Sequence, residues 1–96
     1  MKRDEVINHL QSHRAELKHY GVTFLALFGS VARDEARDGS DLDVLVEFEG
    51  RITFDRYMDF KFYLEDLLRV SVDWVTKKML RSEIRETVER EAIRVA

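Results

Sequence analysis

Two aspartates, Asp41 and Asp43, lie at the start of an apolar run that extends from Leu42 to Phe48. In an extended strand, residues two apart point to the same face, so the two carboxylates face the same way. Carboxylates on one face repel each other unless protons or cations lie between them. Hard divalent cations that also bind phosphate oxygens are the natural counter-ions for such oxygen ligands. The pair therefore predicts metal-assisted chemistry on a phosphate.

A small-residue turn, Gly29-Ser30, precedes Asp41 by ten intervening residues and follows an apolar run from Phe24 to Phe28. Gly29 allows the backbone to approach a ligand closely, because it has no side chain. Ser30 can donate its hydroxyl at the start of the helix that we expect to follow. The turn and the aspartates together indicate a nucleotide site, with Gly29 and Ser30 holding the phosphates.

A third carboxylate, Asp73, lies inside the short apolar segment from Val72 to Val75, where an unpaired charge would be costly to bury. If this segment is a strand beside the one that carries Asp41 and Asp43, the three carboxylates can converge on two divalent ions. Such a pair of ions stabilises the attacking and leaving oxygens in phosphoryl transfer. We expect Asp41 and Asp43 to bridge both ions, and Asp73 to bind one and help deprotonate an incoming hydroxyl.

The segments that position these residues alternate between helical and extended patterns. The spacing predicts helices over about 4–19, 30–37, 54–68 and 80–92, and strands over 22–28, 42–48 and 70–75. Ser82 is a candidate cap for the last helix, and residues 93–96 are either its end or a short edge strand. This order predicts an α/β (α+β) fold in which a small central mixed β-sheet is flanked by helices.

The apolar residues of the two longer C-terminal helices predict which faces they bury. The stripe of the helix over 54–68 is expected to consist of Phe54, Tyr57, Met58, Leu64 and Leu68. The last helix carries a narrow stripe of Leu80, Ile84, Val88 and Ala92. Phe62 and Tyr63 fall outside the first stripe, which makes them candidate anchors for a partner protein.

Size and composition predict one cytoplasmic domain over residues 1–96. Apolar residues make up 45% of the chain, but no apolar stretch is long enough to span a membrane, and no signal peptide is recognisable. The chain contains no cysteine, which excludes disulfides and thiolate metal sites. A formal charge of -3 argues against direct, sequence-independent nucleic-acid binding, which needs clustered basic charge.

The Gly29-Ser30 turn, the Asp41-x-Asp43 motif and Asp73 together resemble a minimal nucleotidyltransferase of the DNA polymerase β superfamily, over essentially the whole chain. Short stand-alone members of this family are similar to antitoxins of HEPN/MNT pairs. In such pairs the nucleotidyltransferase binds a helical ribonuclease toxin, and some members transfer AMP from ATP to a tyrosine of that toxin. The resemblance implies the nucleotidyltransferase fold, ATP as substrate, two Mg²⁺ ions and a hetero-oligomer with a HEPN-type toxin.

Two further positions bear on the nucleotide. Arg33 would lie one helical turn beyond Ser30, where it could clamp a phosphate or simply pair with Asp34 or Glu35 on the surface. Val31 stands where many members of the family carry arginine. The resemblance therefore assigns nucleotide binding to Gly29, Ser30 and Arg33, and catalysis and metal binding to the three aspartates.

Other functions fit the same residues. About twenty residues follow Asp73, too few for an acceptor-binding domain, so we expect the acceptor to be a protein that brings its own binding surface. A non-catalytic antitoxin that silences a toxin by binding alone is one alternative. A dimeric transferase acting on a small molecule is another, and the two aspartates could also be no more than the solvated start of a strand.

Overall fold

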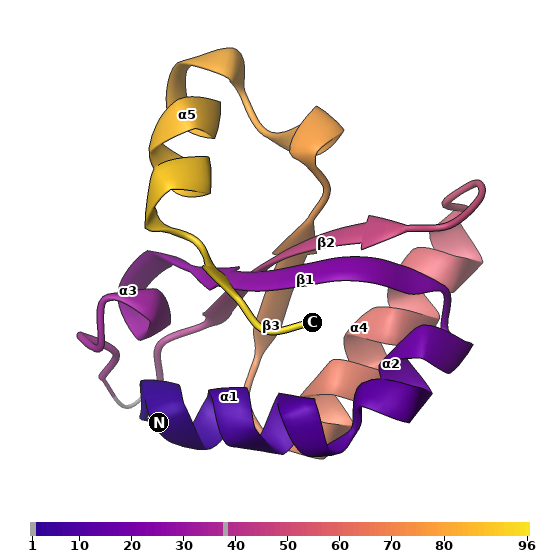
Figure 1. Cartoon of the computed structure of the whole chain (residues 1–96), viewed down its shortest axis with the longest axis horizontal. Helices are drawn as coiled ribbons and strands as arrows, with labels where there is room; N and C mark the ends of the chain where they lie inside the picture. The colour runs from indigo at the N-terminus through magenta and orange to yellow at the C-terminus, as the bar shows by residue number, and fades with distance from the viewer. Residues whose placement is uncertain (1, 38) are drawn as a thin grey trace.

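A four-stranded mixed sheet with the order β3-β2-β1-β4 organises the chain (Figure 1). The structure is a computed structural model that describes residues 2–37 and 39–96. The strands are β1 (Val22–Phe28), β2 (Leu42–Phe48), β3 (Val72–Val75) and β4 (Ile93–Arg94). β1 pairs antiparallel with β2 and β4, whereas β2 and β3 are parallel. This confirms the predicted mixed sheet and the first two strands, and it resolves residues 93–94 as an edge strand.

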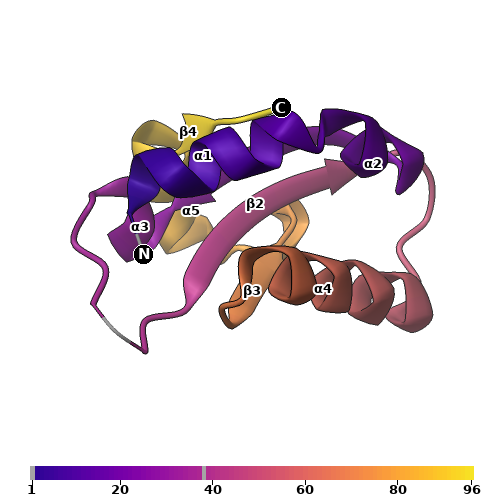
Figure 2. The same ribbon diagram turned by 90° about the horizontal axis from the view of Figure 1, so that it is seen from below.

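Helices cover the two faces of the sheet unequally. They are α1 (Arg3–Ser12), α2 (Arg14–His19), α3 (Gly29–Ala32), α4 (Phe54–Leu68), the 3₁₀ turn η1 (Lys77–Met79) and α5 (Ser82–Glu91). Figures 1 and 2 show α1, α2 and α4 against one face, and α5 on the opposite side. None of the helices within 2–37 and 39–96 is long and apolar enough to cross a membrane.

The alternation of side chains along the strands divides the core in two. Leu27, Val44 and Trp74 point toward α1, α2 and α4 in the main hydrophobic cluster, and each is fully buried. Leu45 points the other way and belongs to a small cluster with Leu80 and Val88. Because α5 and the η1 segment are the only described elements that cover that second face, polar residues on it can reach solvent.

The first helix does not continue over 4–19 as the sequence predicts. It is interrupted at His13, whose backbone leaves the helical region at φ -112° and ψ 25°. The Ser12 hydroxyl donates to the carbonyl of His9 at 2.7 Å, and His13 Nδ1 lies 2.9 Å from the same oxygen. These side chains compete for the carbonyl that the continuing helix would use, so the helix ends and α2 starts a new one.

The helix expected over 30–37 is also shorter, because α3 ends at Ala32 and Arg33 caps it. Asp34 follows with a φ of 59°, a left-handed conformation that no helix interior accommodates. The segment that follows, residues 37–40, includes Asp38, which lies outside the described residues. Within it, the Ser40 N–H donates to the Arg37 carbonyl at 3.0 Å.

The predicted bounds of α4 are correct, but its predicted buried face is partly wrong. Phe54 is 77% exposed, whereas Phe60, absent from the predicted stripe, is fully buried. At 3.6 residues per turn, Phe54 lies about a quarter turn from the centre of the face that Phe60 and Leu64 share. Phe62 is exposed as expected, but Tyr63 is half-buried and its hydroxyl donates to Glu16 at 2.7 Å.

Smaller corrections concern the C-terminal third of the chain. The third strand begins at Val72 rather than at residue 70. Ser82 is the first residue of α5 and not its cap, because the capping position belongs to Arg81 and has no side-chain bond. Ile84 is 47% exposed, so α5 contacts the sheet through a narrower face than its spacing predicts.

Side chains of α4 satisfy the outer edge of β3. Lys61 Nζ donates to the Val72 carbonyl at 2.5 Å, and the Val72 N–H donates to Glu65 Oε2 at 2.9 Å. Farther along, the Tyr57 hydroxyl donates to the Trp74 carbonyl at 3.0 Å. Unpaired strand edges attract other chains, so these bonds close an edge that would otherwise be open. They also tie the strand that carries Asp73 to a long helix.

The two phenylalanines of α4 provide a test of which face is buried. We expect Phe60→Ala to lower the free energy of unfolding by about 3–5 kcal/mol, because it leaves a cavity in the main core. Phe62→Ala should change it by less than about 0.5 kcal/mol, because that ring is mostly in solvent. Urea denaturation of both variants measures the difference, and equal losses would show that the helix is rotated from the position described.

Candidate active site

Asp43 and Asp73 lie directly opposite each other on the parallel strands β2 and β3. Opposed residues of neighbouring strands point to the same face, with the strands about 4.8 Å apart. That face is the one that α5 covers only in part, so Asp73 is exposed and Asp43 is half-buried. Trp74 points into the main core, as the alternation predicts. The sequence predicted that these carboxylates converge only if the two strands are neighbours in the sheet.

The third carboxylate, Asp41, stands immediately before β2 and is exposed. Burial raises the pKa of Asp43, and the negative charges of Asp73 and Asp41 raise that pKa further. The positive charge of Arg33 opposes this shift. Three carboxylates and one guanidinium thus influence one another around Asp43, and the sum of their charges is negative.

Gly29 is required by the position of Asp43. It has a φ of +73°, and a Cβ added there would collide with Asp43 Oδ2 and lie 3.1 Å from Asp43 Cγ. The antiparallel register explains the contact, because Phe28, the residue before Gly29, is paired with Asp43. Glycine therefore serves two needs here: it adopts a left-handed conformation without strain, and it leaves room for a carboxylate on the backbone.

Ser30 and Val31 continue from this contact into α3. Ser30 is half-buried, and its carbonyl accepts the Glu35 N–H at 2.8 Å, which curls the chain back after the helix. Val31 is only 1% exposed and packs in the main core. The Val31 side chain therefore contributes to packing and not to the charge of the site.

Arg33 makes two ion pairs at the rim of the site. Its Nε lies 3.2 Å from Glu35 and one terminal nitrogen lies 3.3 Å from Glu91 of α5. The pairing with Glu35 is one of the two surface alternatives predicted for Arg33. Glu91 was not anticipated, because it is 58 positions away and no local pattern connects the two. Both pairs are exposed, and such pairs are weak enough for a phosphate to displace them.

The donor atoms fit a hard divalent cation better than any other ligand. Carboxylate oxygens are the preferred ligands of Mg²⁺, and the pKa of Asp43 is raised by burial and then by the negative charges of Asp73 and Asp41, which a cation would neutralise. Among the residues that the structure describes, no three acidic or histidine side chains surround one point closely enough to hold an ion. The fold aligns Asp43 with Asp73 and keeps Asp41 within electrostatic range.

Comparison with protein families gives one match over most of the chain. The family model described as "Nucleotidyltransferase domain" matches residues 10–95. A curated relative, "Protein adenylyltransferase MntA" of Thermococcus cleftensis, is 40% identical over 93 residues, which cover 96% of this chain and 94% of the relative. The chain is thus similar to a protein of its own size along nearly its whole length.

Solved structures show the same similarity. A proposed minimal nucleotidyltransferase superposes with a TM-score of 0.83 at 40% identity, over 97% of this chain and 95% of the other. A toxin–antitoxin structure with AMP-PNP has a TM-score of 0.75 at 18% identity, over 93% of this chain and 73% of the other. The second likeness concerns the fold alone, and both confirm the predicted nucleotidyltransferase fold.

A substitution at Gly29 tests the contact with Asp43. We expect Gly29→Ala to be more destabilising than Gly39→Ala, although both glycines have positive φ values. Each variant incurs about 1–2 kcal/mol of left-handed strain, but a Cβ at Gly39 meets no atom within 4 Å, whereas one at Gly29 displaces Asp43. Thermal unfolding of the two variants measures the difference. Equal losses would contradict the contact.

The raised pKa of Asp43 predicts a pH-dependent gain in stability for Asp43→Asn. The folded chain holds the Asp43 proton more tightly than the unfolded chain, so stability is lost as the pH rises from the ordinary value of 3.8 through the raised pKa. In metal-free buffer, Asp43→Asn should therefore unfold at a higher temperature than the wild type near neutral pH, and this advantage should disappear below the ordinary value. A constant difference at all pH values would show that charge repulsion is not its cause.

Proposed function

We propose, from the fact that this chain belongs to the nucleotidyltransferase domain family, that it is a Mg²⁺-dependent protein adenylyltransferase. Its substrate is ATP, and its acceptor is a tyrosine of a HEPN-type toxin with which it forms a hetero-oligomer in the cytoplasm. The observation that carries the proposal is the alignment of Asp43 with Asp73 against the backbone of Gly29. The similarity to a named protein adenylyltransferase over nearly the full chain supports the choice of acceptor.

The reaction requires a hydroxyl, a base and an anionic leaving group. The oxygen of the acceptor tyrosine attacks the α-phosphorus of ATP, and a new phosphorus–oxygen bond forms while the bond to the β-phosphate breaks. Pyrophosphate leaves with the electron pair of that bond. Asp73 takes the proton of the tyrosine hydroxyl, because it is the exposed member of the aligned pair and can reach an incoming side chain.

Asp41, Asp43 and Asp73 are the residues that would hold two Mg²⁺ ions, since Asp43 and Asp73 are aligned on neighbouring strands and Asp41 stands immediately before β2. When bound, the ions neutralise charge on the phosphates and on the attacking oxygen. The backbone at Gly29 and the hydroxyl of Ser30 bind the phosphates that leave. Positive charge that approaches Asp43 lowers the pKa of its carboxyl, as the charge of Arg33 already does.

Arg33 supplies a further cation to the leaving phosphates. Its guanidinium already lies close enough to Asp43 to lower the pKa of that carboxyl. A triphosphate carries more negative charge than Glu35 and Glu91, so it can draw Arg33 away from these exposed partners. Arg33 then closes over the phosphates from the α5 side of the site.

A protein acceptor fits the shape of the site. Asp73 is exposed, and the strand that carries it is tied to α4 through the Lys61 side chain. A protein surface can therefore reach Asp73 from solvent. Structures described as toxin–antitoxin complexes share this fold, one of them with an ATP analogue. They support a toxin as the acceptor and ATP as the donor.

Intact-protein mass of the toxin encoded beside this chain tests the proposal. We expect a mass gain of one or more adenylyl groups after co-expression with the wild type. With Asp43→Asn the rate of transfer should fall by about a hundredfold or more, the scale of loss when one group that stabilises transition-state charge is removed. Asp4→Asn is the control, because it removes an exposed carboxylate on α1 and should leave the mass gain intact.

Two outcomes would contradict this assignment. A toxin that remains unmodified yet is silenced equally by the wild type and by Asp43→Asn would indicate inhibition by binding alone. Transfer to a small hydroxyl compound by the purified chain, with a rate that rises steeply with its own concentration, would indicate a dimeric enzyme with a small-molecule acceptor.

A further inference from the structure

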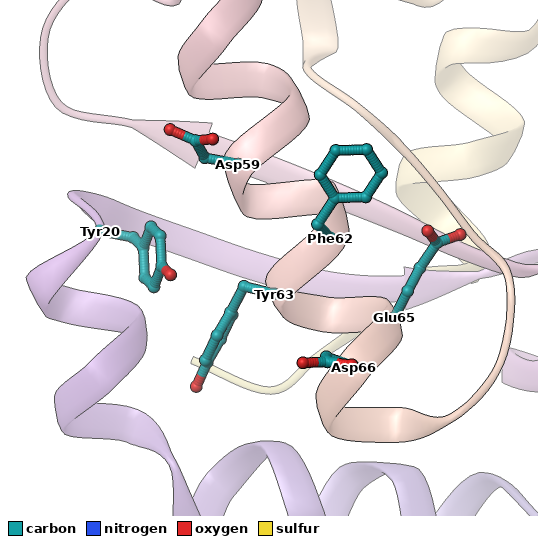
Figure 3. A pocket seen from close by; sticks show the side chains of 6 residues that line it. All are labelled: Tyr20, Asp59, Phe62, Tyr63, Glu65 and Asp66. Carbon is teal, nitrogen blue, oxygen red and sulfur yellow. The ribbon is translucent and has the colours of Figure 1, made fainter.

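A hollow of about 660 Å³ lies on the outer side of α4, on the face of the sheet opposite the active-site carboxylates (Figure 3). It is bounded by α4 and by the end of α2. The residues that line it are Tyr20, Asp59, Phe62, Tyr63, Glu65 and Asp66. None of the three candidate-site aspartates lines this hollow, so the proposed reaction does not explain the residues found there.

The aromatic side chains of the hollow fall into two groups. Tyr20 and Tyr63 are half-buried and pack on each other with ring centroids 4.7 Å apart, and Tyr20 also contacts Phe60 of the core. Phe62 is 57% exposed and takes no part in the ring pairs among the described residues. The tyrosines thus form a rigid floor, while Phe62 presents an aromatic surface to solvent at the rim.

A stripe of carboxylates that form no ion pairs among the described residues lies beside Phe62. Asp55, Asp59 and Asp66 share its side of α4, at spacings that place them within about a sixth of a turn of one another. All three are exposed, and none belongs to an ion pair within the described parts of the chain. Glu65 differs, because it is bound to Lys61 and to the Val72 N–H.

The hollow lies on the opposite face of the sheet from Asp73, but the helix that bounds it is bonded to the strand that carries this residue. Lys61 and Glu65, which flank Phe62 on α4, are bonded to the backbone of Val72. The next residue along β3 is Asp73, the proposed base. Because β3 is the last strand on its side of the sheet, a partner seated on α4 has only the width of one strand to pass before it reaches Asp73.

We propose that this hollow docks a basic segment of the acceptor protein. An apolar or aromatic side chain of that segment packs on Phe62, and lysine or arginine side chains pair with Asp59 and Asp66. Aromatic anchors inside a charged rim are typical of protein interfaces, and opposite charge favours fast and selective association. The carboxylates would repel nucleic acids and anionic small molecules. This inference rests on the proposed function, since it identifies where that acceptor binds.

Binding and transfer by surface variants test the docking site, with the toxin encoded beside this chain as the probe. We expect Phe62→Ala, and separately the double variant Asp59→Lys with Asp66→Lys, to weaken toxin binding about tenfold or more. Added salt should weaken wild-type binding and reduce the effect of the double variant. Glu5→Lys with Glu83→Lys is the matched control, because it makes the same change of charge on exposed parts of α1 and α5.

A second readout separates binding of the acceptor from the chemistry. All of these variants should bind ATP with Mg²⁺ as the wild type does, since the altered residues are remote from Asp43. A photo-reactive phenylalanine analogue at position 62 should cross-link to a segment of the toxin rich in lysine or arginine. The same analogue at the exposed Ile84 of α5 should not.

The outcomes distinguish this inference from the proposed function. If the toxin is adenylylated normally, and every variant binds it as tightly as the wild type, the docking site is wrong and the function stands. Cross-linking of position 62 to a second copy of this chain would show that the hollow is a self-association surface. If the wild type neither binds nor modifies the toxin, both proposals fail.

Discussion

The alignment of two like charges, Asp43 and Asp73, on neighbouring parallel strands is the constraint on which the rest of the site depends. Burial disfavours the charge of Asp43, and repulsion from Asp73 adds to the cost. The strands stay in register because their opposite face carries fully buried side chains, among them Val44 and Trp74. A one-residue slip would move these side chains to solvent and the carboxylates into the core. The packing of apolar side chains on one face of the sheet therefore keeps the two carboxylates aligned on the other face, despite their repulsion.

The unequal cover of the sheet explains how one small domain can hold a core and an open site. α1, α2 and α4 bury the main cluster, and only α5 with the η1 segment lies over the face that carries Asp43. Gly29 completes the arrangement, because the backbone of the turn after β1 replaces a side chain as the surface against which the carboxylate rests. The candidate site is therefore supported by packing on the opposite face of the sheet and is open to solvent on its own face.

α4 links the two surfaces that matter for a protein acceptor. Its inner face packs Phe60 and Leu64 in the core, and its side bonds the backbone of β3 next to Asp73. Its outer face exposes Phe62 among carboxylates that have no cation of their own within the described residues. An acceptor that binds the outer face is thereby positioned relative to the strand that carries the proposed base.

The sequence alone predicted the family and the bounds of β1, β2 and α4, and the roles that it assigned to the site residues stay a prediction. These features depend on local spacing: period-two and period-four apolar patterns, a glycine turn, and carboxylates two residues apart. It did not predict the break at His13, the burial of Phe60 in place of Phe54, or the contact of Arg33 with Glu91. Those depend on competition for one carbonyl, on the rotation of a helix against a sheet, and on the approach of distant segments. Only the tertiary structure decided that Asp43 and Asp73 are neighbours, because strand order follows from how all the apolar faces are buried together.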